Sequence, residues 1–100
     1  MSQRDNVFPF QILVPIAEES EEIEAIALVD ILRRAKANVV IAAVGNSLEV
    51  EGSRKAKLVA EVLLDEVAEK SFDLIVLPVS IANFQNVNIL FSLKLNFNIL

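Results

Sequence analysis

Three short apolar runs rich in branched side chains constrain the fold of this sequence more than any other feature. They lie at residues 11–16 (QILVPI), 39–44 (VVIAAV) and 74–77 (LIVL). Apolar runs of this length are typical of strands that are buried on both faces, as the strands of parallel sheets are. The runs therefore predict three neighbouring parallel strands, joined by connections that are long enough to hold helices.

The connection between the first two runs predicts a helix over residues 23–36, because its apolar side chains recur at helical spacing. Ser20 is expected to cap the amino-terminal end, with Glu21 and Glu22 in the first turn, where negative charge favours the helix dipole. Basic residues occupy the last turn, where positive charge is favoured. Strand, helix and strand together form a βαβ unit of the usual right-handed kind.

The rest of the chain continues this pattern as far as residue 78. Short strands are predicted at residues 48–50 and 57–60, and a short helix is predicted at residues 64–70. The fold class is therefore α/β, with a doubly wound parallel sheet. Residues 11–78 form the predicted domain, preceded by an extension at residues 1–10.

A divergent tail is predicted at residues 79–100, where the composition changes. Lys94 is the only charged residue after Asp73, and five asparagines are interspersed with apolar residues. We expect this tail to be the least well-defined part of the chain, because it lacks a clear cap, turn or amphipathic pattern.

The residue types that are missing exclude several kinds of chemistry. The 100 residues contain no cysteine, histidine, tyrosine or tryptophan, which excludes disulfides, thiolate nucleophiles and histidine bases. The net charge is −5 and the nine basic residues are scattered, so we expect no nucleic-acid partner. No apolar run reaches the ~20 residues that span a bilayer, and there is no signal-peptide pattern. We therefore expect no membrane partner, and a cytoplasmic location with the nucleus as a second one.

Acidic residues cluster before and at the start of the predicted helix, at positions 18, 19, 21, 22 and 24. Carboxylates are ligands for hard cations, but stabilisation of the helix dipole explains the cluster more simply. We therefore predict no metal and no cofactor. Ser80 follows the third run as a serine nucleophile would, but the chain has no histidine base and no G-x-S-x-G motif.

The segments ILVPIAEESEEIEAIALVDILRRAKANVVIAAVG and EGSRKAKLVAEVLLDEVAEKSFDLIVLP resemble the opening of the ThiJ/PfpI family. This family includes the parkinsonism-associated deglycase and the glyoxalase III enzymes. The sequence looks most similar to the second domain of plant members that carry two such domains in tandem. The resemblance covers residues 11–78, less than half of a family domain. It implies a flavodoxin-like sheet, of which this chain holds the amino-terminal half, in a homodimer or paired-domain arrangement that acts on small 2-oxoaldehydes.

The resemblance also implies a site with three parts. A nucleophilic cysteine falls beyond the end of this chain and is missing from it. A glutamate that hydrogen-bonds the thiol matches Glu24, which read by itself is one more solvated acid. A glycine pair that lines the oxyanion pocket falls on Val79 and Ser80. Arg34 and Arg54 match family arginines near the dimer interface and the mouth of the site.

These matches leave three functions open. The first is a truncated glyoxalase III or deglycase type protein, from a family that converts methylglyoxal to lactate in carbonyl-stress protection. Such a fragment is expected to be inactive, because the nucleophile is missing and Val79 resists the positive φ that glycine permits. The second is a non-catalytic module that pairs with full-length members, as a homo- or heterodimer, through the helix at residues 23–36. The third is an unrelated flavodoxin-like ligand domain, although Gly45 and Gly52 form no G-x-G phosphate loop.

Overall fold

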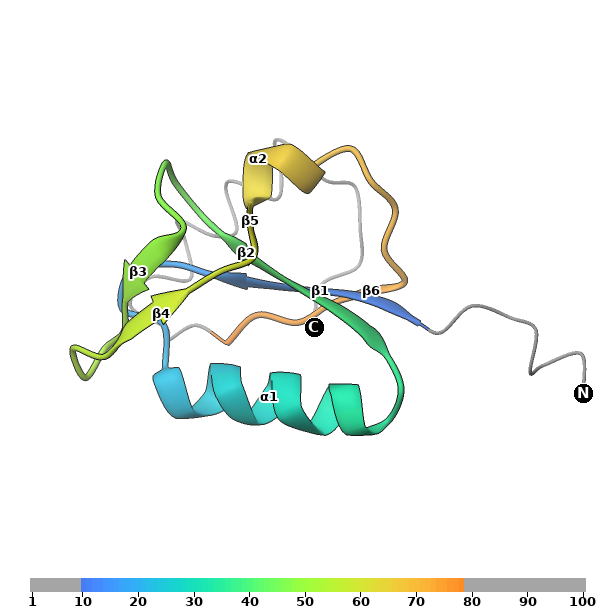
Figure 1. Cartoon of the computed structure of the whole chain (residues 1–100), viewed down its shortest axis with the longest axis horizontal. Coiled ribbons are helices and arrows are strands. Elements are labelled where there is room, and N and C mark those ends of the chain that lie inside the picture. Colours follow the sequence, from blue (N-terminus) through green and yellow to red (C-terminus); the bar gives the residue numbers. More distant parts are fainter. Residues whose placement is uncertain (1–9, 79–100) are drawn as a thin grey trace, which may run out of the picture.

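The computed structural model describes residues 10–78, which fold into alternating strands and helices around one parallel sheet. In chain order the elements are β1 (Gln11–Ile16), α1 (Glu22–Arg34), β2 (Asn38–Ala43), β3 (Glu49–Glu51), β4 (Lys57–Val59), β5 (Val62–Leu63), α2 (Leu64–Val67) and β6 (Leu74–Ile75). Figure 1 shows α1 and α2 on opposite sides of the strands.

The main sheet has four parallel strands in the order β5-β2-β1-β6. β1 runs beside β2 over its whole length, from Gln11 opposite Asn38 to Ile16 opposite Ala43. β6 pairs with the other edge of β1. The parallel pairing predicted for the first two apolar runs is confirmed, and β2, β1 and β6 follow the strand order of a flavodoxin-like sheet.

Side chains that alternate along the strands supply two apolar layers, one beneath each helix. Leu13 and Ala42 point to one face, where they pack with Leu64 of α2. Val14 points to the other face, where Val29 of α1 packs against its cluster. A parallel sheet normally requires cover on both faces, and these two layers supply it. The predicted α/β class with a doubly wound sheet is therefore confirmed for the described part of the chain.

A small antiparallel sheet, β3-β4, forms a hairpin beside the carboxyl ends of β1 and β2 (Figure 1). The two short strands predicted from the sequence correspond to it within one or two residues. The sequence did not predict β5, which pairs with β2 through Val62 and Leu63 alone. Two residues are too few to show the periodicity from which strands are predicted.

The carboxyl-terminal end of α1 lies two residues earlier than predicted. Lys36 has a φ of 72°, and its N–H donates to the carbonyl of Arg33 at 3.0 Å. The N–H of Ala37 reaches back to the carbonyl of Leu32 at 3.1 Å. These two bonds form a Schellman motif, which ends helices at a left-handed residue that is usually glycine.

The second predicted helix is also shorter than expected. α2 has one turn, Leu64–Val67, whereas residues 64–70 were predicted to be helical. Its amino-terminal end is closed by the carboxylate of Glu66, which accepts a hydrogen bond from the N–H of Leu63 at 2.8 Å. After this turn the chain passes Phe72, which is buried in the same apolar layer, and enters β6.

Three predictions concern, in part or in whole, residues that the structure does not describe. The tail at residues 79–100, with Val79 and Ser80, and residues 1–9 of the extension lie outside the described residues. Within residues 10–78, no helix is both long enough and apolar enough to cross a membrane.

Candidate functional site

The strand order locates a candidate site at the carboxyl ends of β1 and β6. The chain steps from β1 to β2 on one side and later returns to pair β6 on the other. In open parallel sheets, this change of direction creates a crevice at the carboxyl ends, where ligands bind. The loop at residues 17–21 follows β1 here, and the N–H of Glu21 donates to the carbonyl of Pro78 at 3.3 Å.

Ser20 shapes the loop after β1 and does not cap the helix as predicted. It is fully buried, and its hydroxyl accepts a hydrogen bond from the N–H of Ala17 at 2.9 Å. Glu21 occupies the position before the first helical residue, and its side chain makes no capping bond. The prediction was wrong because Glu21, one residue later, occupies the N-cap position, so the Ser20 hydroxyl lies inside the loop and not at the first turn of the helix.

The β3–β4 hairpin is hydrogen-bonded to this loop. The N–H of Glu19, whose φ is 68°, donates to the carbonyl of Glu51 at 2.7 Å. The N–H of Ser53 donates to the carbonyl of Ser20 at 2.9 Å. The carboxylate of Glu18 accepts the N–H of Glu51 at 3.3 Å. The hairpin therefore has a defined position relative to β1, beside the loop that follows this strand.

Glu22, the first residue of α1, makes the densest set of hydrogen bonds in this region. Its Oε2 accepts the N–H groups of Arg54 at 2.9 Å and Ala56 at 3.0 Å. Its Oε1 accepts the hydroxyl of Ser53 at 3.3 Å. Partial burial raises the pKa of the Glu22 carboxyl. Hydrogen bonds from the N–H groups of Glu22 itself, Ala56 and Arg54 and from the hydroxyl of Ser53 lower this pKa by more. The pKa of Glu22 therefore lies below its ordinary value of 4.5.

Gly52 makes room for this contact. It is buried, and a Cβ at this position would collide with the Cγ, Cδ and Oε2 atoms of Glu22. An isolated glycine beside a strand is a known signal for a close approach of another group. That signal, together with the acidic residue at the start of the helix, was the only sequence indication of the Glu22 contact, which the sequence analysis missed.

Glu24, the predicted catalytic position, lies in the first turn of α1 and is exposed. Within the described part of the chain, its carboxylate has no hydrogen-bond or ion-pair partner. The structure therefore shows it as a solvated acid at the positive end of the helix dipole.

The two predicted arginines lie near opposite ends of α1. Arg34 is in the last turn of α1, where its Nε lies 3.1 Å from a carboxylate oxygen of Asp30. It is ten residues from Glu24, or roughly 15 Å along the helix axis. Arg54 is exposed at the tip of the hairpin, close to Glu22 through its backbone N–H. The structure therefore places the backbone of Arg54 beside Glu22 at the start of α1, whereas Arg34 lies at the other end of this helix.

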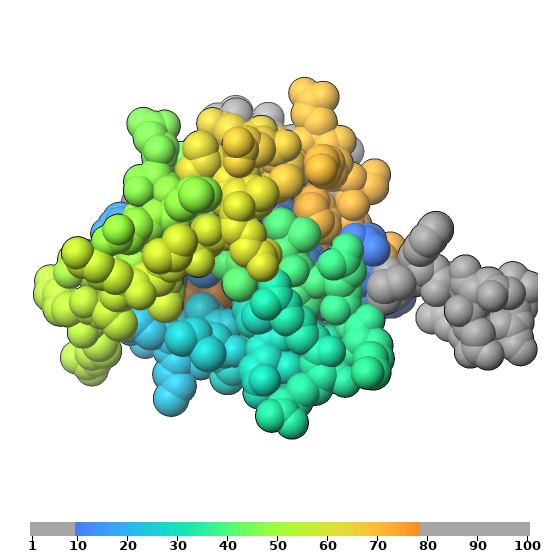
Figure 2. Space-filling model, in the orientation of Figure 1, coloured from blue at the N-terminus to red at the C-terminus, as the bar shows by residue number. Residues whose placement is uncertain are grey.

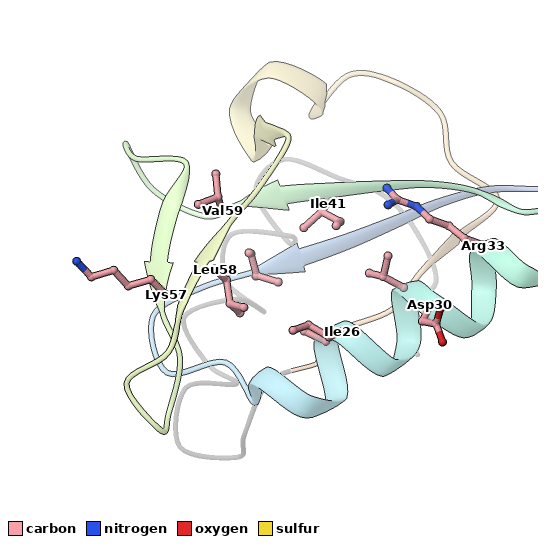
Figure 3. Close-up of a pocket in the computed structure, with 10 residues that line it drawn as sticks. Ile26, Asp30, Arg33, Ile41, Lys57, Leu58 and Val59 are labelled. Carbon is pink, nitrogen blue, oxygen red and sulfur yellow. The ribbon is translucent and has the colours of Figure 1, made fainter.

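An apolar groove lies beside this region, between α1, β2 and β4. Its volume is about 460 Å³, and Figure 3 shows Ile26, Ile41 and Leu58 pointing into it. In Figure 2 the corresponding hollow separates the yellow-green hairpin from the blue-to-teal helix. Arg33, at its rim, is already paired with Glu61 at 2.9 Å. The groove is therefore suited to apolar surface more than to a charged ligand.

The chemistry available at the crevice comes from carboxylates, hydroxyls and backbone amides. Among residues 10–78, no three acidic side chains are grouped so that they could hold a metal ion. The sequence contains no thiol and no imidazole at all. Such a site can orient a polar group or exchange a proton with it, but it cannot attack a carbonyl with a thiolate.

The sequence matches the DJ-1/PfpI family over residues 10–86. Protein DJ-1 homolog B of Arabidopsis thaliana is 72% identical over 68 residues, which make up 68% of this chain and 16% of the plant protein.

Two solved structures are similar to the chain in fold and sequence. Drosophila melanogaster DJ-1beta has a TM-score of 0.73 at 32% identity, over 78% of this chain and 42% of that one. Oxidized Toxoplasma gondii DJ-1 has a TM-score of 0.70 at 40% identity, over 73% of this chain and 40% of that one. The chain thus spans less than half the length of each of these relatives.

Proposed function

Because this chain belongs to the DJ-1/PfpI family, we propose that it supplies the amino-terminal half of a glyoxalase III or deglycase type domain and has no turnover of its own. In that proposal the complete domain converts small 2-oxoaldehydes such as methylglyoxal to lactate and protects against carbonyl stress. A cytoplasmic and nuclear location, and a closest similarity to the second domain of plant members with two such domains in tandem, belong to the same proposal.

The observation that carries this proposal is the isolation of Glu24. Conversion of methylglyoxal by a thiolate route requires a nucleophile, a carboxyl that moves protons, and amides that hold the oxyanion. These 100 residues contain no cysteine, and Glu24 faces solvent without a partner among residues 10–78. A carboxylate alone contributes ~10²–10⁴-fold at best, and only to a substrate that is held beside it.

The test is a lactate assay on the purified chain. Methylglyoxal incubated with the wild-type chain should yield lactate no faster than it does with Glu24→Ala, and Drosophila DJ-1beta can be assayed in parallel as a relative that contains more of the fold. Lactate formation by the wild-type chain clearly above the Glu24→Ala rate would contradict catalytic silence, and it would identify Glu24 as a working acid or base.

A second function, pairing with a DJ-1/PfpI subunit, is favoured by a separate observation on α1. Three isoleucines of this helix are largely exposed: Ile23 at 78%, Ile26 at 58% and Ile31 at 60%. Large apolar side chains grouped on one exposed helix are typical of interaction surfaces. Asp30 and Arg34, which pair with each other on the same helix, supply a polar border.

This pairing can be measured by sedimentation of the chain mixed with Arabidopsis DJ-1 homolog B. Ile23→Ser together with Ile31→Ser should weaken the complex at least tenfold, because both substitutions remove apolar surface from α1. Leu48→Ser, at an exposed apolar residue outside the helix, is the matched control and should leave the affinity unchanged. An equal loss of affinity in the double isoleucine variant and in Leu48→Ser would rule out pairing through α1. The absence of any complex with the wild-type chain would rule it out as well.

A further inference from the structure

One edge of β2 is covered by another strand over only part of its length. β5 pairs with the last two residues of β2, and among residues 10–78 no strand continues this pairing toward the start of β2. The N–H of Asn38 donates to the carbonyl of Phe10, on the side of β1. Because the backbone groups of successive residues point to opposite edges of a strand, those of Val39 and Ile41 face the side that β5 leaves open.

Two charged side chains occupy these backbone groups. The guanidinium of Arg33, which reaches from the last turn of α1 toward β2 (Figure 3), donates to the carbonyl of Val39 at 3.0 Å. The carboxylate of Glu61 accepts the N–H of Ile41 at 3.0 Å, and the N–H of Glu61 donates to the carbonyl of Ile41 at 2.9 Å. The two side chains also pair with each other at 2.9 Å. Together they lie along the part of the edge where a further strand would otherwise bind.

An open edge at this position would favour association. Unpaired N–H and C=O groups at the edge of a sheet are a template for a further strand. The sequence of β2, NVVIAA, carries no charge, and branched apolar side chains follow its first residue. Short uncharged segments with a high strand propensity pair readily with copies of themselves. β2 therefore combines a self-pairing sequence with an edge that another strand covers only in part.

We propose that Arg33 and Glu61 protect the edge of β2, so that the β2 strand of a second copy of this chain cannot add to it. Glu61 blocks the edge directly, because its carboxylate and its N–H occupy both backbone groups of Ile41. Arg33 occupies the carbonyl of Val39 and holds the carboxylate of Glu61 in place through the ion pair. This role is independent of the pairing proposed above, which uses the exposed isoleucines of α1.

The first experiment measures amide hydrogen exchange by NMR on the whole chain, in the Ile23→Ser, Ile31→Ser background so that association through α1 is weakened. At low protein concentration, Glu61→Ala should increase the exchange rate of the Ile41 amide at least tenfold, while the amides of β1 keep their protection. Glu69→Ala, at an exposed glutamate away from this edge, is the matched control and should leave Ile41 unchanged. Unchanged protection of Ile41 in Glu61→Ala, or loss of β1 protection together with it, would overturn the proposal.

The second experiment measures sedimentation of the same proteins over a range of concentrations. Glu61→Ala should form a heavier species than the background protein or Glu69→Ala at the same concentration. In that species the amide of Ile41 should regain its protection, because a new strand now accepts it. Association without renewed protection of Ile41, or no added association at any concentration, would show that this edge needs no protection.

Glu61→Gln separates the hydrogen bond from the charge. Glutamine keeps an oxygen that can accept the N–H of Ile41 but loses the ion pair with Arg33, so this variant should associate less than Glu61→Ala. Association of Glu61→Gln as strong as that of Glu61→Ala would contradict direct blocking of Ile41 and would assign the effect to the charge of Glu61.

Discussion

Glu22 and Glu24 lie two positions apart in the first turn of α1, yet their surroundings differ completely. Glu22 accepts hydrogen bonds from three residues of the hairpin tip, whereas Glu24 is exposed. The charge of Glu22 is therefore part of the folded structure, while that of Glu24 faces water. Whether an acidic residue is structural or free for chemistry is decided here by a hairpin more than thirty residues away in the sequence.

The lowered pKa of Glu22 predicts a pH-dependent contribution to stability. A carboxyl whose pKa is lower in the folded state than in the unfolded state stabilises the fold above its ordinary pKa, and this stabilisation disappears as the pH falls through the folded-state pKa. The melting temperature of Glu22→Gln should therefore lie below that of the wild type at neutral pH, and the gap should close as the pH falls below 4.5.

This comparison is made by thermal unfolding of the wild type and Glu22→Gln between pH 7 and pH 3. Glu24→Gln serves as the control, because its side chain accepts none of the bonds from the tip. A constant gap between wild type and Glu22→Gln over the whole range would show that the charge of Glu22 is not what stabilises the contact.

Gly52 provides a second prediction at the level of one residue. Gly52→Ala should lower the free energy of unfolding by roughly 1–3 kcal/mol, the usual cost of overpacking, because the new methyl group collides with the Glu22 side chain. The same change made in a Glu22→Ala background should cost much less, since the obstructing atoms are gone. Denaturant unfolding of the wild type, the two single variants and the double variant measures the cost of Gly52→Ala in each background. Equal costs in the two backgrounds would mean that the collision is not the cause.

At the residue scale, the sequence predicted which residues begin the helix but not which groups their side chains contact. It expected acids at the start of the helix to stabilise its dipole, and Glu22 and Glu24 do lie in the first turn. It assigned Ser20 to the helix cap, but the Ser20 hydroxyl accepts the N–H of Ala17, three residues earlier in the same loop. The partners of Glu22 lie in the hairpin, so they could not be found from local patterns.

At the scale of elements, α1 shows how a strong pattern predicts a helix but not its last residue. Basic residues near the carboxyl-terminal end were expected to continue the helix to residue 36. The chain instead ends it at Arg34, with Lys36 in the left-handed conformation. An L-residue in this conformation costs ~1–2 kcal/mol, which glycine does not incur. The turn is held by bonds to Arg33 and Leu32, so the folded structure maintains the strain.

Lys36→Gly should therefore increase stability. Relief of the left-handed strain is offset in part by the greater freedom of glycine in the unfolded chain, which leaves a net gain of roughly 0.5–1 kcal/mol. Lys36→Ala removes the same side chain and charge but keeps the strain, so it should give no gain. The two variants can be compared by chemical denaturation, and a gain for alanine equal to that for glycine would disprove the explanation.

The strands at the three apolar runs were predicted within a residue or two because burial on both faces fixes their composition. β5 was not predicted, and α2 was predicted to be three residues longer than it is. β5 has two residues and α2 has four, too few for either period to appear, and their conformations depend on pairing with β2 and on packing around Leu64. Short elements of this kind follow from the tertiary structure more than from local preference.

At the scale of the whole molecule, the described residues form the first part of a DJ-1/PfpI fold with a covered sheet and an uncovered helix. The sheet is buried beneath α1 and α2, but the outer face of α1 and the strand β4 expose large apolar side chains, among them Ile23 and Val59. The apolar groove between α1 and β4 adds to this surface. A surface of this kind favours association.

The proposal that this chain pairs through α1 is tested most directly by sedimentation of the purified chain. The chain alone should sediment as a species heavier than its monomer mass of 11.0 kDa, and Ile23→Ser with Ile31→Ser should shift it toward the monomer. A wild-type chain that sediments as a clean 11.0 kDa monomer and melts cooperatively would contradict the claim.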